Sequence, residues 1–164
     1  MRSLLAAALA LLLLAFVAGA DDNILSPARG ARVMKRTSED PRAPAANLID
    51  DTAAGGWRSS DGTFPQEIIF QLPAATRFDT LVFSPAPGAP IEQWPRAAEV
   101  YTADPFPTMG GWREVARVTL APTPGDQTFT VPAIEGRFIR LVMLSAQADG
   151  APRVALGRLK IFMR

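Results

Sequence analysis

The stretch from 47 to 59 carries three neighbouring side chains whose oxygens can act as hydrogen-bond acceptors. Asp50, Asp51 and Thr52 can each bond back to nearby backbone, and residues with this property favour a turn over a helix or a strand. On local chemistry alone, the plain interpretation is a polar surface turn pinned to the fold by one tryptophan.

The residues around this turn indicate how it is held. Leu48 and Ile49 precede it and should be buried, and Trp57 closes it with a large apolar surface. Gly55 and Gly56 stand just before the tryptophan and allow backbone angles that are closed to other residues.

The composition argues against an enzyme. The chain contains no His and no Cys, so the usual general base, zinc ligand and triad partner are all missing. Catalysis by two carboxylates would remain chemically open. The Asp and Glu residues, however, are scattered without a motif that pairs them. We therefore expect a protein with no catalytic residues.

The first twenty residues have the pattern of a secretory signal peptide. A short start containing Arg2 is followed by an apolar run from 4 to 18, and Ala18-Gly19-Ala20 then offers the small residues that a signal peptidase reads. We predict cleavage after Ala20, which gives a secreted or periplasmic protein without a transmembrane anchor. Retention of the run as an anchor is the alternative.

The remaining chain, 21–164, has the size of one domain. Loss of Arg2 leaves equal numbers of basic and acidic residues. A neutral balance gives no electrostatic argument for binding nucleic acid or an anionic membrane.

Fifteen Pro and eleven Gly divide this domain into short runs rich in Val, Ile, Phe and Thr, which is the composition of strands. Alternation places Ile68, Phe70 and Leu72 on one face, and we expect Pro73 to end that strand. The pattern predicts an all-β sandwich or barrel of about eight strands. The expected strands are 31–35, 67–72, 77–84, 96–103, 112–120, 127–131, 137–145 and 154–162.

Six segments, in order, resemble the discoidin family, also called the coagulation factor 5/8 type C domain. They are the loop 47–59 and the segments 65–72, 95–102, 111–116, 136–141 and 154–162. The resemblance covers nearly all of 21–164. It implies a galactose-binding-like jelly-roll β-sandwich of antiparallel strands, and periodicity alone leaves an immunoglobulin-like sandwich open.

The resemblance also implies a non-catalytic binding module whose ligand lies on loops at one end of the sandwich. In this chain those loops are 59–64, 85–95 and 146–153. Trp94 is the candidate aromatic face for a sugar ring, and Arg58, Asp61 and Arg153 are candidate hydrogen-bonding partners. Each has a plainer alternative: Trp94 as a plug at the end of the sandwich, and the three others as solvated charges.

The expected partner is carbohydrate or another cell-surface component. The alternative is a structural or protein-interaction domain that keeps the fold without a sugar site. The His that some sugar-binding relatives carry in these loops is absent, which weakens the case for galactose-like sugars. Trp57 and Trp112 match core positions of the family and are expected to be structural.

Many relatives hold a structural calcium ion in the loop that corresponds to 47–57. Here Asp50 matches one ligand, but Gly55 stands at the place of a Thr ligand and Arg158 at the place of a Glu ligand. We therefore expect no cofactor and no metal: Arg158 should pair with Asp50 or Asp51 and donate to the loop carbonyls. Calcium held through other oxygens is the alternative.

Overall fold

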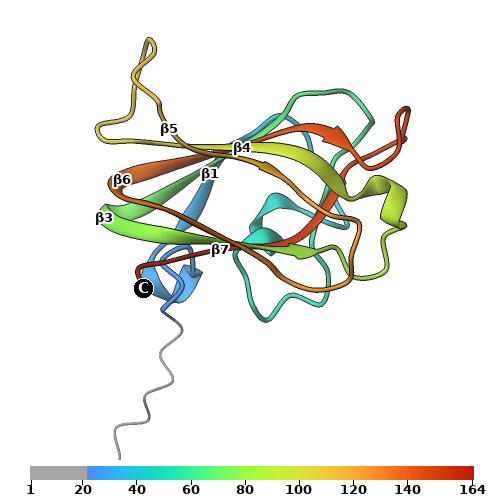
Figure 1. The fold of residues 1–164 in the computed structure, drawn as a ribbon, viewed down its shortest axis with the longest axis horizontal. Helices are drawn as coiled ribbons and strands as arrows, with labels where there is room; N and C mark the ends of the chain where they lie inside the picture. Colours follow the sequence, from blue (N-terminus) through green and yellow to red (C-terminus); the bar gives the residue numbers. More distant parts are fainter. Residues whose placement is uncertain (1–21) are drawn as a thin grey trace, which may run out of the picture.

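Two strands of twenty residues each run through both halves of the fold in the computed structural model, which describes residues 22–164 (Figure 1). They are β3 (Gln66–Pro85) and β6 (Gln127–Ala146). The other strands are β1 (Arg32–Arg36), β2 (Trp57–Arg58), β4 (Pro95–Ala103), β5 (Arg113–Thr119) and β7 (Ala155–Phe162). Three short 3-10 helices accompany them: η1 (Pro27–Arg29), η2 (Ala45–Leu48) and η3 (Ile91–Gln93).

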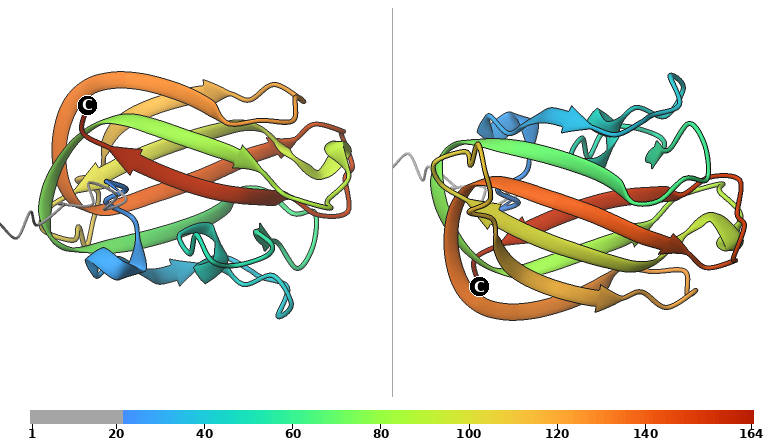
Figure 2. Two further views of the ribbon diagram at one scale, coloured as in Figure 1. Left: turned by 90° about the horizontal axis from the view of Figure 1, so that it is seen from below. Right: turned by 90° about the horizontal axis from the view of Figure 1, so that it is seen from above.

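All strand pairs are antiparallel, and their hydrogen-bonded order is β2-β7-β3-β6-β4-β5, with β1 beside β3. The first half of β3 pairs with β1 and the second half of β6, whereas its second half pairs with β7 and the first half of β6. Figure 2 shows β3 and β6 curving around one end of the molecule, so that the strands form two facing layers. The predicted all-β sandwich is confirmed.

The described residues contain seven strands, close to the predicted number of about eight, but the chain is divided differently and β2 was not predicted. Pro73 does not end a strand. It lies inside β3, where the register with β6 shifts between Gln71 and Thr76. A proline is tolerated at such an irregularity because no ladder hydrogen bond is required of it. The runs 127–131 and 137–145 are likewise parts of one strand, β6.

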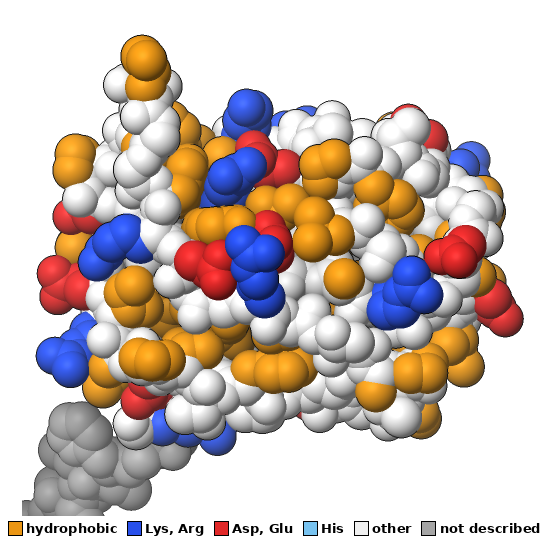
Figure 3. Space-filling view, turned by 45° about the horizontal axis from the view of Figure 1, so that its top comes forward, with side chains coloured by type: hydrophobic (Ala, Val, Ile, Leu, Met, Phe, Trp, Pro, Cys, Tyr) orange, Lys and Arg blue, Asp and Glu red, His pale blue; other side chains and the backbone are white. Residues whose placement is uncertain are grey.

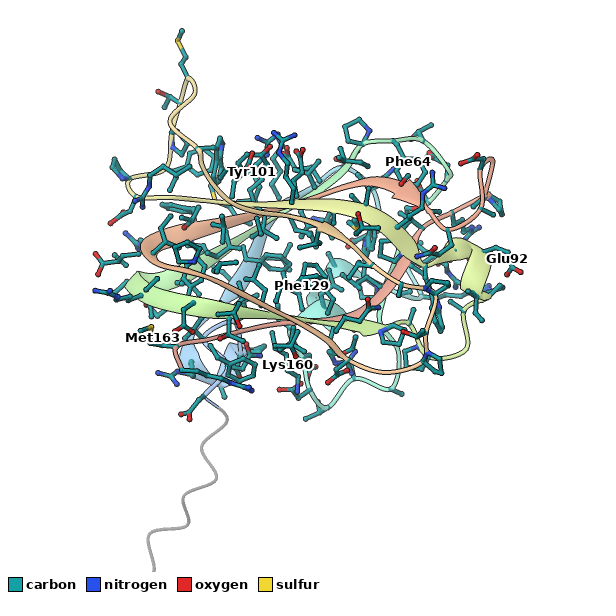
Figure 4. The ribbon with its side chains drawn as sticks, in the orientation of Figure 1. Phe64, Glu92, Tyr101, Phe129, Lys160 and Met163 are labelled. Atoms are coloured by element: carbon teal, nitrogen blue, oxygen red, sulfur yellow. The ribbon has the colours of Figure 1, made fainter. Side chains whose placement is uncertain are left out.

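The core lies between the layers and follows the predicted alternation. Ile68, Phe70 and Leu72 are at most 1% exposed, as expected for one inward face. Phe83 is also buried and meets the ring of Phe129 edge-on at 5.8 Å; Phe129 points into the interior in Figure 4. Each such buried side chain stabilises the fold by about 1.5–3 kcal/mol relative to exposure.

The first described residues lie beside the last strand. Asn23 is buried, and its side-chain oxygen accepts hydrogen bonds from the N–H groups of Leu25 and Ile161. The N–H of Ile24 donates to the Ile161 carbonyl at 2.9 Å. The chain therefore enters and leaves the sandwich at one end. The predicted signal peptide, 1–20, lies outside the described residues.

Candidate functional site

The three loops expected to form a binding end do lie together. The N–H groups of Gln147 and Ala148 donate to the carbonyls of Trp94 and Glu92, which joins 146–153 to 85–95. A Cβ on Gly62 would lie 2.2 Å from the Ala151 carbonyl oxygen, so 59–64 also contacts 146–153. Phe64 and Glu92 lie at this end in Figure 4.

Two of the predicted site residues, Arg58 and Arg153, meet on Asp40, a residue that was not predicted for the site. Arg153 Nη1 donates to Asp40 Oδ2 at 2.6 Å, and Arg58 Nη2 lies 3.1 Å from the same oxygen. The side chain of Asp40 is only 13% exposed. We call Asp40, Arg58 and Arg153 the arginine cluster.

Local structure fixes each member of the arginine cluster. Arg58 lies on β2, opposite Ala155, and Arg153 stands just before β7, so both side chains start from the same end of that strand pair. Asp40 is held by its backbone, since its N–H donates to the Arg58 carbonyl at 2.8 Å. Its Oδ1 accepts the N–H of Arg42 at 2.9 Å.

Sequence reasoning missed Asp40. The available signal was an Asp before Pro41 in a stretch already expected to be loop, where an Asp caps the backbone two residues ahead. Nothing in the sequence indicated which arginines it would meet, because Arg153 is 113 residues away.

Two hollows adjoin the arginine cluster. One, of about 390 Å³, is lined by Asp40, Pro41, Arg42, Ser60 and Arg153. The other, of about 210 Å³, lies between the segments 42–58 and 86–89 and is lined in part by Asn47, Trp57 and Arg58. Arg42 lines both. The Nε of Arg58 is buried and bonds to none of the described residues.

Asp61 serves its own turn. One carboxylate oxygen accepts the N–H and the hydroxyl of Thr63, at 2.9 and 2.5 Å, and the other accepts the Ser60 hydroxyl. These bonds, that of the Thr63 hydroxyl first, lower the pKa of Asp61. The carboxylate therefore orders the loop that brings Ser60 to the larger hollow.

Trp94 lies apart from the arginine cluster and lines neither hollow. It is half-buried beside a narrow crevice that it shares with Pro85, Leu120 and Leu156. Its Nε1 is buried and has no hydrogen-bond acceptor among the described residues. Contact between its ring and a ligand stays a prediction.

The other two tryptophans differ from each other. Trp57 is 1% exposed and donates from Nε1 to the Ser38 carbonyl at 3.1 Å, as expected for a structural residue. Trp112 is half-buried and meets Phe106 edge-on at 5.9 Å, so it packs against neighbouring side chains without lying in the core. The Arg140 guanidinium lies 5.7 Å from the Trp112 ring, so Trp112 packs on the outside of the sheet.

Arg158 donates to the carbonyls of the loop, as predicted. Nη1 bonds to the oxygens of Gly55 and Gly157, at 2.6 and 2.8 Å, and Nη2 bonds to that of Ala53. We call this arrangement the carbonyl cage. A guanidinium among these oxygens does not fit calcium, which needs them as ligands. A loop without metal stays a prediction.

The expected pairing of Arg158 with Asp50 is wrong. Asp50 accepts the N–H and the hydroxyl of Thr52, at 2.9 and 2.7 Å, because a short side chain satisfies the nearest donors first. The Thr52 hydroxyl lowers the pKa of Asp50 most, and the charge of Arg158 adds a smaller effect at longer range. Asp51 pairs with Lys160 at 3.0 Å.

The two glycines before Trp57 do not use the left-handed backbone that is open to glycine: neither Gly55 nor Gly56 has a positive φ. Gly56 is required for space: a Cβ there would lie 2.1 Å from the Leu156 carbonyl oxygen, where β2 pairs with β7.

The lowered pKa values of four aspartates predict that the fold is sensitive to acid. The carboxyl groups of Asp40, Asp50, Asp61 and Asp79 all have pKa values below the ordinary 3.8. Their stabilising effect is present above that value and is lost as the pH falls through the folded-state pKa values. We expect the Tm to fall steeply below about pH 4, in a titration followed by circular dichroism.

Asp61→Asn is the matched variant for this titration. It should lower the Tm at neutral pH and flatten the acid limb of the curve, since one depressed carboxyl is gone. A Tm that stays level down to about pH 2.5 would contradict the prediction.

The comparisons with known proteins concern both sequence and fold. The family model described as F5/8 type C domain matches residues 33–156. No curated protein matches the chain. None of the helices in 22–164 is long and apolar enough to span a membrane.

Solved structures show the same fold at low identity. The module CpGH89CBM32-5 from Clostridium perfringens, in complex with GalNAc-β-1,3-galactose, is similar at 17% identity and a TM-score of 0.66, over 80% of this chain and 94% of that one. The family 32 module of C. perfringens NanJ, in complex with galactose, gives 18% and 0.66, over 80% and 92%. The family 32 carbohydrate-binding module of Streptococcus pneumoniae EndoD gives 15% and 0.68, over 87% and 99%.

Proposed function

Because this chain belongs to the F5/8 type C domain family, we propose that it is an exported, non-catalytic module that binds carbohydrate at the loop end of its sandwich. Two structural neighbours were solved with galactose or GalNAc-β-1,3-galactose bound, which supports this class of ligand. The signal peptide predicted over 1–20 supports export to the periplasm or the outside.

The observation that carries the proposal is the arginine cluster beside two hollows. Sugar hydroxyls are bound by fixed planar groups that donate or accept in one geometry. Guanidinium groups provide such groups, with up to five donors in a rigid fork. Asp40 holds the Arg58 and Arg153 forks in place from one side, so that their remaining donors are available to a ligand.

The same chemistry supports binding without catalysis. A guanidinium offers hydrogen-bond donors and no acceptor, so Arg58 and Arg153 serve to bind and orient a ligand. Asp40, the carboxylate between them, is already engaged by both arginines and by the Arg42 N–H. It orients the donors.

Trp94 and Asp61 complete the proposed site in different ways. Asp61 shapes the loop beside the larger hollow. Trp94 stands at the same end with a half-buried ring, whose face suits the apolar side of a sugar. The Trp94 crevice would be a second place of contact.

A glycan array probed with the purified protein tests the proposal. We expect binding to a limited set of glycans and at least about tenfold weaker binding by Arg153→Gln, because a charge-assisted bond to the ligand is lost. Arg117→Gln is the matched control: it removes the same charge from β5, where Arg117 pairs with Glu99 and Glu114. Its binding should equal that of the unchanged protein.

Trp94→Ala tests whether the indole ring contacts the ligand. Weaker binding at an unchanged Tm assigns the indole ring to the ligand, whereas a lower Tm with intact binding makes Trp94 a structural plug. Absence of binding across the array would overturn the proposal and favour the alternative, a structural or protein-interaction domain.

A further inference from the structure

The arginine cluster has more positive than negative side chains. Arg58 and Arg153 share the Asp40 carboxylate, and Arg42, which lines both hollows, adds a third positive side chain beside this cluster. Asp40 is fully used: Arg153 donates to Oδ2, Arg58 forms an ion pair with the same oxygen, and the Arg42 N–H donates to Oδ1.

The acidic residues closest in sequence do not supply the missing negative charge. Glu39 pairs with Arg36 at 2.7 Å and accepts the N–H of Ala45. The carboxylate of Asp61 bonds to Ser60 and Thr63, and no ion pair joins it to an arginine of the described residues. The positive excess therefore stays at the hollow.

Several donors of the cluster are unused. Each guanidinium carries five N–H donors. For Arg153 the hydrogen bonds found use only Nη1, and for Arg58 the ion pair uses only Nη2 while Nε is buried without a partner among residues 22–164. Buried donors cost free energy unless an acceptor reaches them, so the site favours a ligand rich in acceptor oxygens.

From this excess of charge and donors we propose that the ligand is an acidic carbohydrate, one that carries a carboxylate or sulfate group which binds to Arg58 and Arg153 beside Asp40. This inference rests on the proposed function and narrows its ligand class. Carboxylate and sulfate each present two acceptor oxygens on one central atom, and a guanidinium fork binds such a pair in bidentate fashion. The larger hollow, about 390 Å³, lies within the range of about 300–1,000 Å³ typical of small-ligand pockets.

The distribution of charge favours this ligand over a charged membrane surface. The whole chain has 17 basic and 16 acidic residues, so it has no general positive field. On the face shown in Figure 3, Lys and Arg side chains lie among Asp and Glu side chains without a broad area of one sign. Attraction to a membrane needs a wide basic surface, whereas two arginines at each hollow, Arg42 with Arg153 and Arg42 with Arg58, fit a single acidic group.

Calorimetry with pairs of glycans that differ only in charge tests the proposal. Oligogalacturonate is compared with its methyl ester, and a sulfated galactan with the same galactan after desulfation. We expect the charged member of at least one pair to bind at least about tenfold tighter, with the preference reduced as NaCl rises from about 50 mM to about 500 mM. The pair that shows the preference identifies carboxylate or sulfate as the group recognised.

The variants connect this preference to the cluster. Arg58→Gln and Arg153→Gln should each reduce the charged-over-neutral ratio about tenfold, and Arg117→Gln should leave it unchanged. Arg153→Lys keeps the charge but loses the fork, so an intermediate ratio is expected. If either Gln variant fails to fold, as judged by its Tm, Arg153→Lys is the variant that tests the role of the guanidinium fork.

Three outcomes would overturn the inference. Equal binding of charged and neutral members rejects it while the proposed sugar-binding function stands. Equal affinity for vesicles containing phosphatidylserine makes the attraction a general response to charge. Binding of no glycan in either pair or on the array removes the proposed function as well.

Discussion

Replacing Arg158 with alanine is expected to lower the free energy of unfolding by about 2–3 kcal/mol. The change removes the donors of the carbonyl cage and leaves the oxygens of Ala53, Gly55 and Gly157 without them. Gly157 is buried, and a buried acceptor left unpaired costs about 1–3 kcal/mol. Ala53 and Gly55 are half-buried, so water can bond to their carbonyl oxygens, which limits the free energy lost at these two residues. For a domain of this size the Tm should fall by about 5–10 °C.

Lys160→Ala is the matched control. Lys160 lies two residues further along β7 and pairs with Asp51, with both side chains about a third exposed. An exposed pair contributes at most about 1 kcal/mol, so this loss of a neighbouring charge should be small. An Arg158→Ala protein as stable as the unchanged one would contradict the structural role of the carbonyl cage.

Calcium provides the second arm of the Arg158 experiment. Titration of the chelator-treated protein should show no micromolar binding, since the guanidinium holds the oxygens that calcium would need. Arg158→Glu removes the cation and adds a carboxylate, so weak calcium binding is expected in that variant. A Tm of the unchanged protein that rises several degrees with calcium would overturn the prediction of a loop without metal.

Gly56→Ala is expected to destabilise the domain by about 3 kcal/mol, at the upper end of the effects of overpacking. The new Cβ would lie 2.1 Å from the Leu156 carbonyl oxygen and 2.6 Å from the Gly157 Cα. Both atoms are backbone of β7, so the clash can be relieved only by moving β2 or β7. Chemical denaturation followed by tryptophan fluorescence measures the loss, because Trp57 adjoins the site.

Gly55→Ala is the control for Gly56→Ala. A Cβ on Gly55 would have no atom within 4 Å, and its backbone is not left-handed. Stability should be unchanged or raised by up to about 1 kcal/mol, because alanine restricts the unfolded chain. Equal effects of the two adjacent substitutions would show that β2 does not lie against β7 as described.

Local patterns predicted the core well, because alternation depends only on neighbouring residues. Ile68, Phe70 and Leu72 are buried as period two requires. The effect of Pro73 was predicted wrongly, because a proline ends a strand only where the neighbouring strand needs a hydrogen bond from it. β3 crosses between the layers at that point, and residue 73 is not part of the paired register with β6. That crossing is a property of the tertiary fold.

The candidate site was predictable only in part. Arg158 stood out because a positive charge replaces an expected carboxylate, and its bonds to the loop carbonyls are confirmed. Asp40 gave no such signal, since its role depends on two arginines brought to it by strand pairing. The sequence also grouped Trp94 with Arg58 and Arg153. Trp94 lines neither of the hollows beside the two arginines, which only the tertiary fold decides.

The hydrogen bond from Ile24 to Ile161 has a practical consequence for how the protein can be attached to something else. It places the first described residues next to the last strand, at the end of the sandwich away from η3 and the loops (Figure 1). A linker joined at either terminus therefore leaves the loop end pointing outward, free to reach a surface. Closeness of the two ends also makes circular permutation feasible, with new termini opened in a turn such as that around Gly125.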